Sequence, residues 1–307
     1  TGRSRAGLGM KTGWVDGLAE WTEGDTAFLS VAFTWRLNEA RDRALWYRSI
    51  GFRVRAGGPA TFRPHGYLEG YAELGGAIED AVRRHHPDAT VASRGCPVNC
   101  WFCIVPKMHG SVFTMLPDFP VRPILCDDNL SALPIDYQNH IIERYRSFNV
   151  PLRDANSGFE PRTFDGGTYE RWSKLLRGPW RFGYDEMKER TEVERMMALL
   201  RSNGVKPRKV QVYCMIGHED PDTCLGRIRQ IIEWGGEPYV QRNMKLNALE
   251  KTPWVRPELG WTEQKLSAMA RWANRRIWRY APFESYDVNA KTSRRRSPKQ
   301  LALESVA

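Results

Sequence analysis

The chain has 307 residues, enough for one large α/β domain or for a domain with appendages. Its hydrophobic content of 41% is ordinary, and no apolar run approaches the roughly 20 residues that span a bilayer, which excludes a membrane-spanning helix. The net charge of +10 divides into +3 in residues 1–11, +4 in residues 290–307 and +3 between them. Both ends are therefore basic, and charge alone says little about an active-site substrate.

The compartment is predicted from the first residues and from the cysteines. The first ten residues are polar, basic and glycine-rich, without the hydrophobic core of a signal peptide. Three of the six cysteines are packed closely together, which fits metal ligands in a reducing compartment better than a disulfide framework. We therefore expect a cytoplasmic protein.

The N-terminal part, residues 1–88, is predicted to form a small α/β unit. Residues 25–33 are rich in β-forming side chains, residues 37–50 have the pattern of an amphipathic helix, and residues 52–56 form a second strand. A strand–helix–strand connection of this length predicts parallel pairing of the two strands.

The segment that follows contains Cys96, Cys100 and Cys103 with the spacing C-x3-C-x2-C. Three thiolates in eight residues can bind three irons of a [4Fe–4S] cluster and leave the fourth iron without a protein ligand. A structural zinc site that includes His109 is an alternative, although no second cysteine pair is present. A plain electron carrier is another, although the fourth cysteine of ferredoxin-type spacing is missing nearby.

This spacing, with the aromatic Phe102 directly before the third cysteine, resembles the signature of the radical S-adenosylmethionine (SAM) superfamily. The resemblance implies that the open iron chelates the amine and carboxylate of SAM. It further implies that an external one-electron reductant, a flavodoxin or a ferredoxin, supplies the electron that cleaves SAM. The products are methionine and a 5′-deoxyadenosyl radical, which abstracts a hydrogen atom from the substrate.

Downstream of residue 88, predicted strands alternate with predicted helices, the pattern of a parallel sheet with helices outside. The strands are expected at 89–92, 123–126, 150–153, 180–185, 209–217 and 238–241, and the helices at about 134–147, 168–177, 191–203 and 222–234. The alternation resembles the partial (β/α)6 barrel of radical SAM enzymes over residues 89–250. Ligands of such barrels gather at the carboxyl ends of the strands.

Polar residues follow the second predicted strand at Asp127, Asp128 and Asn129. Their position resembles that of the superfamily stretch that holds the SAM amine, and their oxygens can accept hydrogen bonds from an ammonium group. The alternative is an Asx turn that begins the next helix. Asn156 after the third strand is a candidate contact to the SAM ribose or to substrate, or belongs to an internal polar turn.

Two residues of the fifth strand, Ile216 and Gly217, resemble the superfamily positions that contact the adenine of SAM. Three further residues on strands are candidates for catalysis. Cys126 and Cys214 are each a possible hydrogen-atom donor to a product radical if they face the cavity, although most isolated cysteines are core residues. Tyr184 ends the fourth strand.

The C-terminal part, residues 251–307, is predicted to contain one long amphipathic helix over 263–280 and the basic tail. Arg271, Arg275 and Arg279 lie four residues apart, with Trp272 and Trp278 between them. This arrangement predicts contacts to DNA phosphates and bases, to which the tail would add charge. Alternatively, the helix covers the barrel and its arginines are solvated.

The compact build resembles small radical SAM proteins of phage genomes, with a degenerate cobalamin-type N-terminal domain that lacks the D-x-H-x-x-G cobalt motif. That resemblance implies a modified nucleic-acid base as substrate, for example through rearrangement of an amino-acid adduct on hypermodified thymine. A free small molecule or nucleotide is the alternative substrate.

Overall fold

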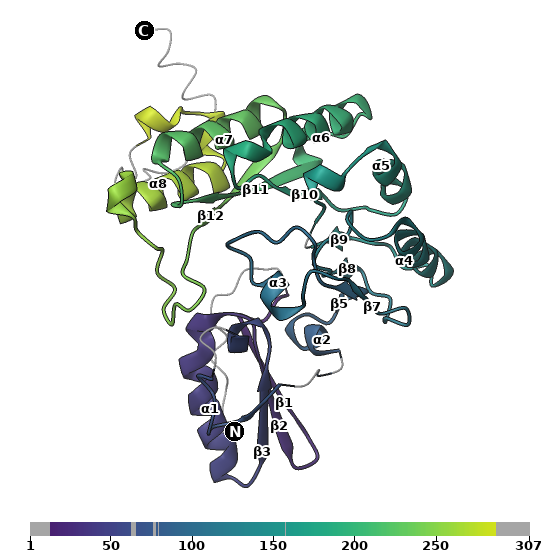
Figure 1. Ribbon diagram of the computed structural model, residues 1–307, viewed down its shortest axis with the longest axis vertical. Helices are drawn as coiled ribbons and strands as arrows, with labels where there is room; N and C mark the ends of the chain where they lie inside the picture. Colours follow the sequence, from purple (N-terminus) through teal and green to yellow (C-terminus); the bar gives the residue numbers. More distant parts are fainter. Residues whose placement is uncertain (1–12, 63–65, 76–77, 79, 157, 287–307) are drawn as a thin grey trace.

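The computed structural model describes residues 13–62, 66–75, 78, 80–156 and 158–286 (Figure 1). The basic segment 1–11 and the basic tail at 290–307 both lie outside these residues. No helix in the described part of the chain is both long and apolar enough to cross a membrane.

The N-terminal unit is a four-stranded sheet with one long helix against it. The strands β1 (Leu18–Glu23) and β2 (Thr26–Val31) form an antiparallel hairpin, and β3 (Arg53–Gly57) and β4 (Glu73–Leu74) continue the sheet in parallel. The helix α1 (Leu37–Ser49) connects β2 to β3 and buries one apolar stripe against them. The predicted parallel strand–helix–strand is confirmed, whereas β1 and β4 were not predicted.

Six short parallel strands follow in chain order, as predicted, but they belong to two sheets. One sheet contains β5 (Ala89–Thr90), β8 (Ile124–Leu125) and β9 (Asp154–Ala155), and the other contains β10 (Trp180–Gly183), β11 (Val210–Ile216) and β12 (Glu237–Arg242). Among the described residues no ladder joins β9 to β10, although the backbone N of Phe159 donates to the carbonyl of Arg181 at 2.8 Å. A mixed α/β fold is therefore confirmed.

The third strand lies later than its predicted position at 150–153. Only Leu152 of that segment makes a β-bridge, to Leu176, and the ladder with β8 begins at Asp154. Between β5 and β8 the chain also forms a small antiparallel hairpin, β6 (Ser93–Arg94) with β7 (Thr114–Met115), which encloses the short helix α3 (Val105–Met108).

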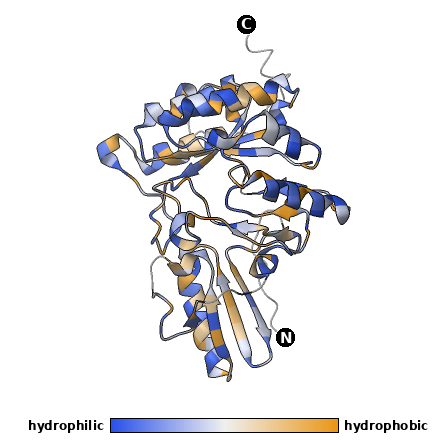
Figure 2. Cartoon of the chain, turned by 45° about the vertical axis from the view of Figure 1, so that its right-hand side comes forward, coloured by the Kyte–Doolittle hydropathy of each residue, from blue (hydrophilic) through white to orange (hydrophobic). Residues whose placement is uncertain are grey.

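The predicted helices between the strands are present within a few residues of their expected bounds. They are α4 (Ile135–Ser147), α5 (Gly166–Ser173), α6 (Arg190–Ser202) and α7 (Pro221–Glu233), and the short α2 (Ala81–His85) precedes β5. Asp165 and Asp220 begin α5 and α7 by accepting backbone hydrogen bonds from Thr168 and Thr223. Figure 2 shows hydrophilic and hydrophobic residues alternating along these helices, whose apolar sides join the main core.

The C-terminal helix is shorter than predicted. Helix α8 (Glu263–Asn274) ends because Arg276 adopts a left-handed conformation (φ 57°), and residues 277–279 form a separate 3₁₀ turn. Trp272 is buried in the core, and Arg279 forms an ion pair with Glu237 at 2.6 Å. Arg271, Arg275 and Arg279 therefore do not form one helical face with stacking tryptophans, so the predicted helix over 263–280 was wrong, and the DNA contact of these arginines stays a prediction. The alternative, a helix that covers the β10–β12 sheet, is the one observed.

Candidate cluster and ligand site at the strand ends

The three cysteines of the C-x3-C-x2-C segment lie in the loop between β6 and α3 and are half-buried. Gly95 begins this loop with φ +100°, and a Cβ on it would lie 2.4 Å from the carbonyl oxygen of Val112. A glycine is thus required for the loop to pass this close to the other half of the hairpin. The backbone N of Cys96 then donates to the carbonyl of Gly110 at 3.2 Å, which closes the loop.

Two of the three sulfurs have a hydrogen-bond donor, and the third has a cation beside it. The Asn129 side-chain amide donates to Cys96 Sγ at 3.4 Å, and the backbone N of Val105 donates to Cys103 Sγ at 3.4 Å. The Arg162 guanidinium lies beside Cys100, and its positive charge lowers the pKa of that thiol. Hydrogen bonds to ligand sulfurs are a means by which proteins set the potential of an iron–sulfur cluster. The chemistry of the donor set therefore fits a cysteine-ligated cluster.

Burial affects the ionisation of these thiols. It raises the pKa of Cys100 to about 11, against the opposing effect of Arg162. It also raises the pKa of Cys103, to which the negative charge of Cys96 contributes. Burial therefore disfavours the thiolate forms of Cys100 and Cys103, which need a positive charge nearby. Bound iron supplies such a charge, because coordination deprotonates a thiol.

The zinc alternative gains no support from the geometry. Within the described part of the chain, no three His, Cys, Asp or Glu side chains converge as ligands of a single metal ion would. His109 instead directs Nδ1 to the Asp128 carboxylate at 2.7 Å. A cubane places each cysteine on its own iron and does not require such convergence on one point.

Asp127 and Asp128, at the end of β8, hold the cysteine loop in place. Asp127 is fully buried and accepts hydrogen bonds from the backbone N of Ala92, at 2.7 Å, and from the Ser93 hydroxyl. Asp128 accepts a hydrogen bond from the backbone N of Gly95 at 2.7 Å. Both oxygens of the Asp127 carboxylate accept hydrogen bonds from the residues that lead into the loop, so this carboxylate helps to position the loop.

One face of the parallel strands has a continuous polar network. The Arg181 guanidinium on β10 pairs with Asp154 on β9 at 2.8 Å and donates to the Tyr213 hydroxyl on β11 at 2.7 Å. The rings of Tyr213 and Tyr239 on β12 pack at 5.2 Å. These residues are register partners or near neighbours, so their side chains share one face. This network links the two sheets.

Cys126 and Asn156 lie on the same side as this network. Cys126 is two residues after Ile124, the register partner of Asp154, so alternation places it on the network face. The Asn156 amide nitrogen lies 3.9 Å from the Cys126 sulfur. Burial raises the pKa of Cys126 to about 12, which keeps it a neutral thiol with an S–H bond. Both residues therefore remain candidates for contacts to a ligand.

The opposite face of the sheet is covered by helices and contains three of the predicted site residues. Cys214 is fully buried and accepts a hydrogen bond from Arg227 on α7 at 3.2 Å. The Tyr184 hydroxyl donates to Gln230, also on α7, at 2.6 Å. Ile216 is fully buried in the same core. The catalytic roles predicted for Cys214 and Tyr184, and the adenine contact predicted for Ile216, were therefore wrong.

Gly217 follows β11 with φ +99°, a conformation that side chains other than glycine rarely adopt. A Cβ on Gly217 would lie 3.1 Å from Leu266 of α8 and 3.7 Å from Asn243. The observed role of this glycine is thus to turn the chain and to let α8 pack closely.

The sequence did not predict that Trp101, His218 and Asp185 lie near the cluster cysteines. Trp101 of the loop lies 5.7 Å from the His218 ring, which follows β11 and is buried. Asp185, after β10, accepts a hydrogen bond from the backbone N of Met215 at 2.7 Å, and burial raises its pKa to about 7. Its charge also affects Cys103. The loop therefore lies at the carboxyl ends of β8, β10 and β11.

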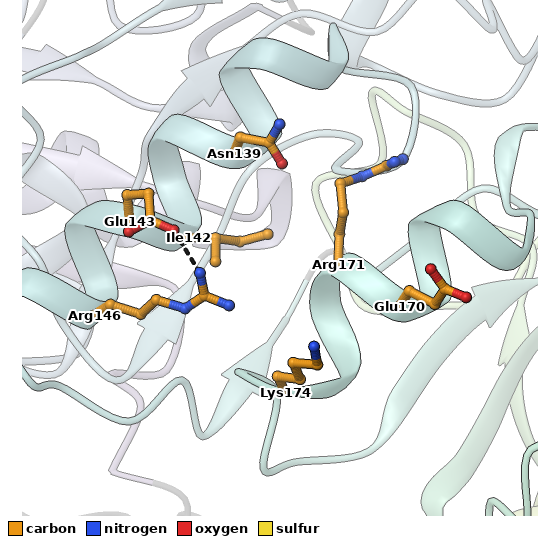
Figure 3. A pocket seen from close by; sticks show the side chains of 7 residues that line it. All are labelled: Asn139, Ile142, Glu143, Arg146, Glu170, Arg171 and Lys174. Carbon is orange, nitrogen blue, oxygen red and sulfur yellow. Dashed lines mark hydrogen bonds and ion pairs between the residues drawn. The ribbon is translucent and has the colours of Figure 1, made fainter.

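A shallow groove between α4 and α5 lies elsewhere. Figure 3 shows its lining, which contains Asn139, Ile142, Glu143, Arg146, Glu170, Arg171 and Lys174. None of these residues belongs to the cysteine loop or to a strand end, and Glu143 and Arg146 pair with each other. The groove does not contribute to the candidate site.

Neither the scan against protein-family models nor the search of curated proteins found a match to the chain.

Proposed function

We propose that this protein is a radical SAM enzyme whose [4Fe–4S] cluster is held by Cys96, Cys100 and Cys103. The observation that carries this proposal is that three thiols of one loop meet two hydrogen-bond donors and the Arg162 guanidinium at the carboxyl ends of parallel strands. When bound, the cluster and SAM would supply a 5′-deoxyadenosyl radical, with an electron from an external flavodoxin or ferredoxin.

In this proposal, residues around the cysteine loop position the ligand sulfurs and the loop itself. Asn129, Arg162 and the Val105 backbone orient the ligand sulfurs, and the two aspartates after β8 fix the loop. Phe102 packs edge-on against Trp101 at 5.3 Å within the loop, which limits the freedom of both rings. We further propose that β5 to β12 act as one partial (β/α)6 barrel, with Arg181 and Asp154 connecting its two sheets.

The leading substrate in this proposal is a modified nucleic-acid base, from which hydrogen is abstracted. Of the two predicted strand thiols, Cys126 is the one on the polar face of the strands, so it is the candidate for returning a hydrogen atom to a product radical. A free nucleotide or another small molecule is the alternative, which a substrate screen with purified protein would distinguish.

The test is anaerobic reconstitution with iron and sulfide. We expect about four irons and four sulfides per chain, as a cubane requires, and a change in the electron paramagnetic resonance spectrum of the reduced protein when SAM is added. Cys→Ala variants at the three positions should lose the cluster. A single bound zinc ion, or a reduced cluster whose spectrum does not change when SAM is added, would contradict the proposal.

A further inference from the structure

The loop between β12 and α8, residues 243–256, reaches from the strand ends to the N-terminal unit (Figure 1). Its stem is closed by a hydrogen bond from the backbone N of Trp254 to the carbonyl of Asn243 at 2.9 Å. At its far end the Thr34 hydroxyl donates to the carbonyl of Ala248, and Leu249 packs against the N-terminal core. The loop thus connects the strand ends with the N-terminal unit.

Aromatic rings on this loop and beside it are accompanied by cations. Trp254 is 37% exposed, and Lys245 and Arg256 each lie 5.3 Å from its ring centre. Lys251 lies 5.5 Å from the ring of Trp35, which stacks on the exposed ring of Phe33 at 4.5 Å.

Contacts of Arg256 and His218 connect these side chains to the cysteine loop. Arg256 donates to the carbonyl of His218 at 3.4 Å, and His218 lies beside the half-exposed Trp101. Residues 243–256 contain three basic residues and one acidic residue, a net +2 out of the +3 of residues 12–289. The loop therefore carries a net positive charge next to the rings of Trp35 and Trp254.

We propose that this surface, defined by Trp35, Lys245, Lys251 and Trp254, binds a single-stranded stretch of nucleic acid and leads it to the cysteine loop. Exposed aromatic faces stack on unpaired bases of any sequence, and neighbouring lysines contact phosphates. A paired duplex hides its base faces from such rings. The surface rests on the proposed function, for which it specifies the polymeric substrate and how it is held.

Fluorescence anisotropy of a labelled 20-nucleotide oligo-dT with the full-length, reconstituted protein tests this surface. Trp254→Ala should weaken binding by roughly tenfold, as expected for the loss of one stacked base. The double variant Lys245→Ala/Lys251→Ala should reduce the slope of log affinity against log salt by about 1.4, which corresponds to two phosphate contacts of a single strand. Thermal unfolding of each variant checks that the fold is kept.

Trp46→Ala is the matched control, because Trp46 on α1 is 46% exposed and has the Arg43 guanidinium 4.3 Å from its ring but lies outside this loop. It should bind as the wild type does. An abasic strand of equal length has the same phosphates and no bases, so it should bind more weakly than oligo-dT. Its affinity should be the same for the wild type and for Trp254→Ala.

Three results would overturn the surface. They are wild-type affinity in the Trp254 variant, equal binding of the abasic strand, and equal lysine-dependent binding of polyglutamate. Formation of 5′-deoxyadenosine without substrate should be unchanged in the control variant Trp46→Ala. Intact SAM cleavage without strand binding would reject this surface alone, whereas strand binding without SAM cleavage would reject only the radical chemistry.

Discussion

Individual hydrogen bonds to sulfur are the features of the site that most directly connect the sequence to its chemistry. The two donors come from the turn after β8 and from the start of α3, and the Arg162 guanidinium comes from the segment before α5, so they meet only in the folded protein. A donor stabilises the extra negative charge of a reduced cluster and so favours its reduction.

Replacing Asn129 with alanine should make reduction of the cluster more difficult. The variant loses the hydrogen bond to Cys96, and a bond of about 1 kcal/mol corresponds to a midpoint potential lower by roughly 40 mV. Redox titration of the reconstituted protein measures this shift. Asn156→Ala removes an amide near Cys126, which is not a ligand, and should leave the potential unchanged. Equal potentials in wild type and Asn129→Ala would contradict the assignment.

Asp185 should make the stability of the fold depend on pH. Burial raises its folded pKa to about 7, above the unfolded value near 4, so the unfolded chain releases this proton first. Its contribution is complete below about pH 4 and is lost as the pH rises toward 7. Asp185→Asn keeps an acceptor for the Met215 backbone and should flatten this part of the profile, measured by urea denaturation. An unchanged slope would contradict the prediction.

The sequence predicted the cysteines and the polar residues after β8, because spacing and strand ends are local features. It did not predict which face of a strand points to the helices. Cys214 and Ile216 share a face by alternation, and that face became the buried one because α7 covers it. The position of Arg162 beside Cys100 could likewise not be predicted, since the two residues meet only through tertiary packing.

At the scale of elements, one buried arginine ties helix α7 to two strands. Arg227 donates to the carbonyls of Tyr184 and Met215 at 2.9 and 3.0 Å, and it pairs with Glu219 at 2.9 Å. It therefore fixes the carboxyl ends of β10 and β11, where the site lies.

Arg227→Met should lower the free energy of unfolding by about 3–5 kcal/mol, because it leaves two carbonyls and a carboxylate without their partner. Chemical denaturation measures this change. Arg229→Met on the same helix breaks an exposed pair with Glu284 and should leave stability nearly unchanged. Similar losses of unfolding free energy in both variants would show that the buried Arg227 contacts contribute no more to stability than the exposed ion pair does.

The sequence located helices better than helix ends. The bounds of α6 and α7 agree with prediction within one residue, because their apolar stripes and caps are local signals. Helix α8 ended six residues early at Asn274, and the left-handed residue after it is Arg276, where no glycine marks the stop.

At the scale of the whole molecule, the sequence predicted the order of the parallel strands but not their division into two sheets. The short strands β5, β8 and β9 pair over two residues each. Segments this short show no clear alternation of apolar and polar residues, so the sequence does not indicate which strands pair. The contact of the 243–256 loop with the N-terminal unit joins residues 214 positions apart and depends on tertiary packing alone.

That contact predicts how the loop responds to a mutation. Leu249→Asp places a charge against the N-terminal core and should release the loop, so trypsin should cleave faster after Lys245 and Lys251. Limited proteolysis with mass spectrometry measures this. Leu116→Asp, at a residue that is 39% exposed, is the control and should leave these sites unchanged. Equal cleavage in both variants would show that Leu249 does not hold the loop.

Formation of 5′-deoxyadenosine tests the central proposal most directly. The reconstituted protein is reduced with dithionite under anaerobic conditions, given SAM, and compared with Cys100→Ala and with Cys224→Ser, a buried cysteine outside the triad. The account predicts 5′-deoxyadenosine from the wild type and from Cys224→Ser, and none from Cys100→Ala. Absence of the product from a wild-type protein with an intact, reduced cluster, with and without oligonucleotide, would contradict it.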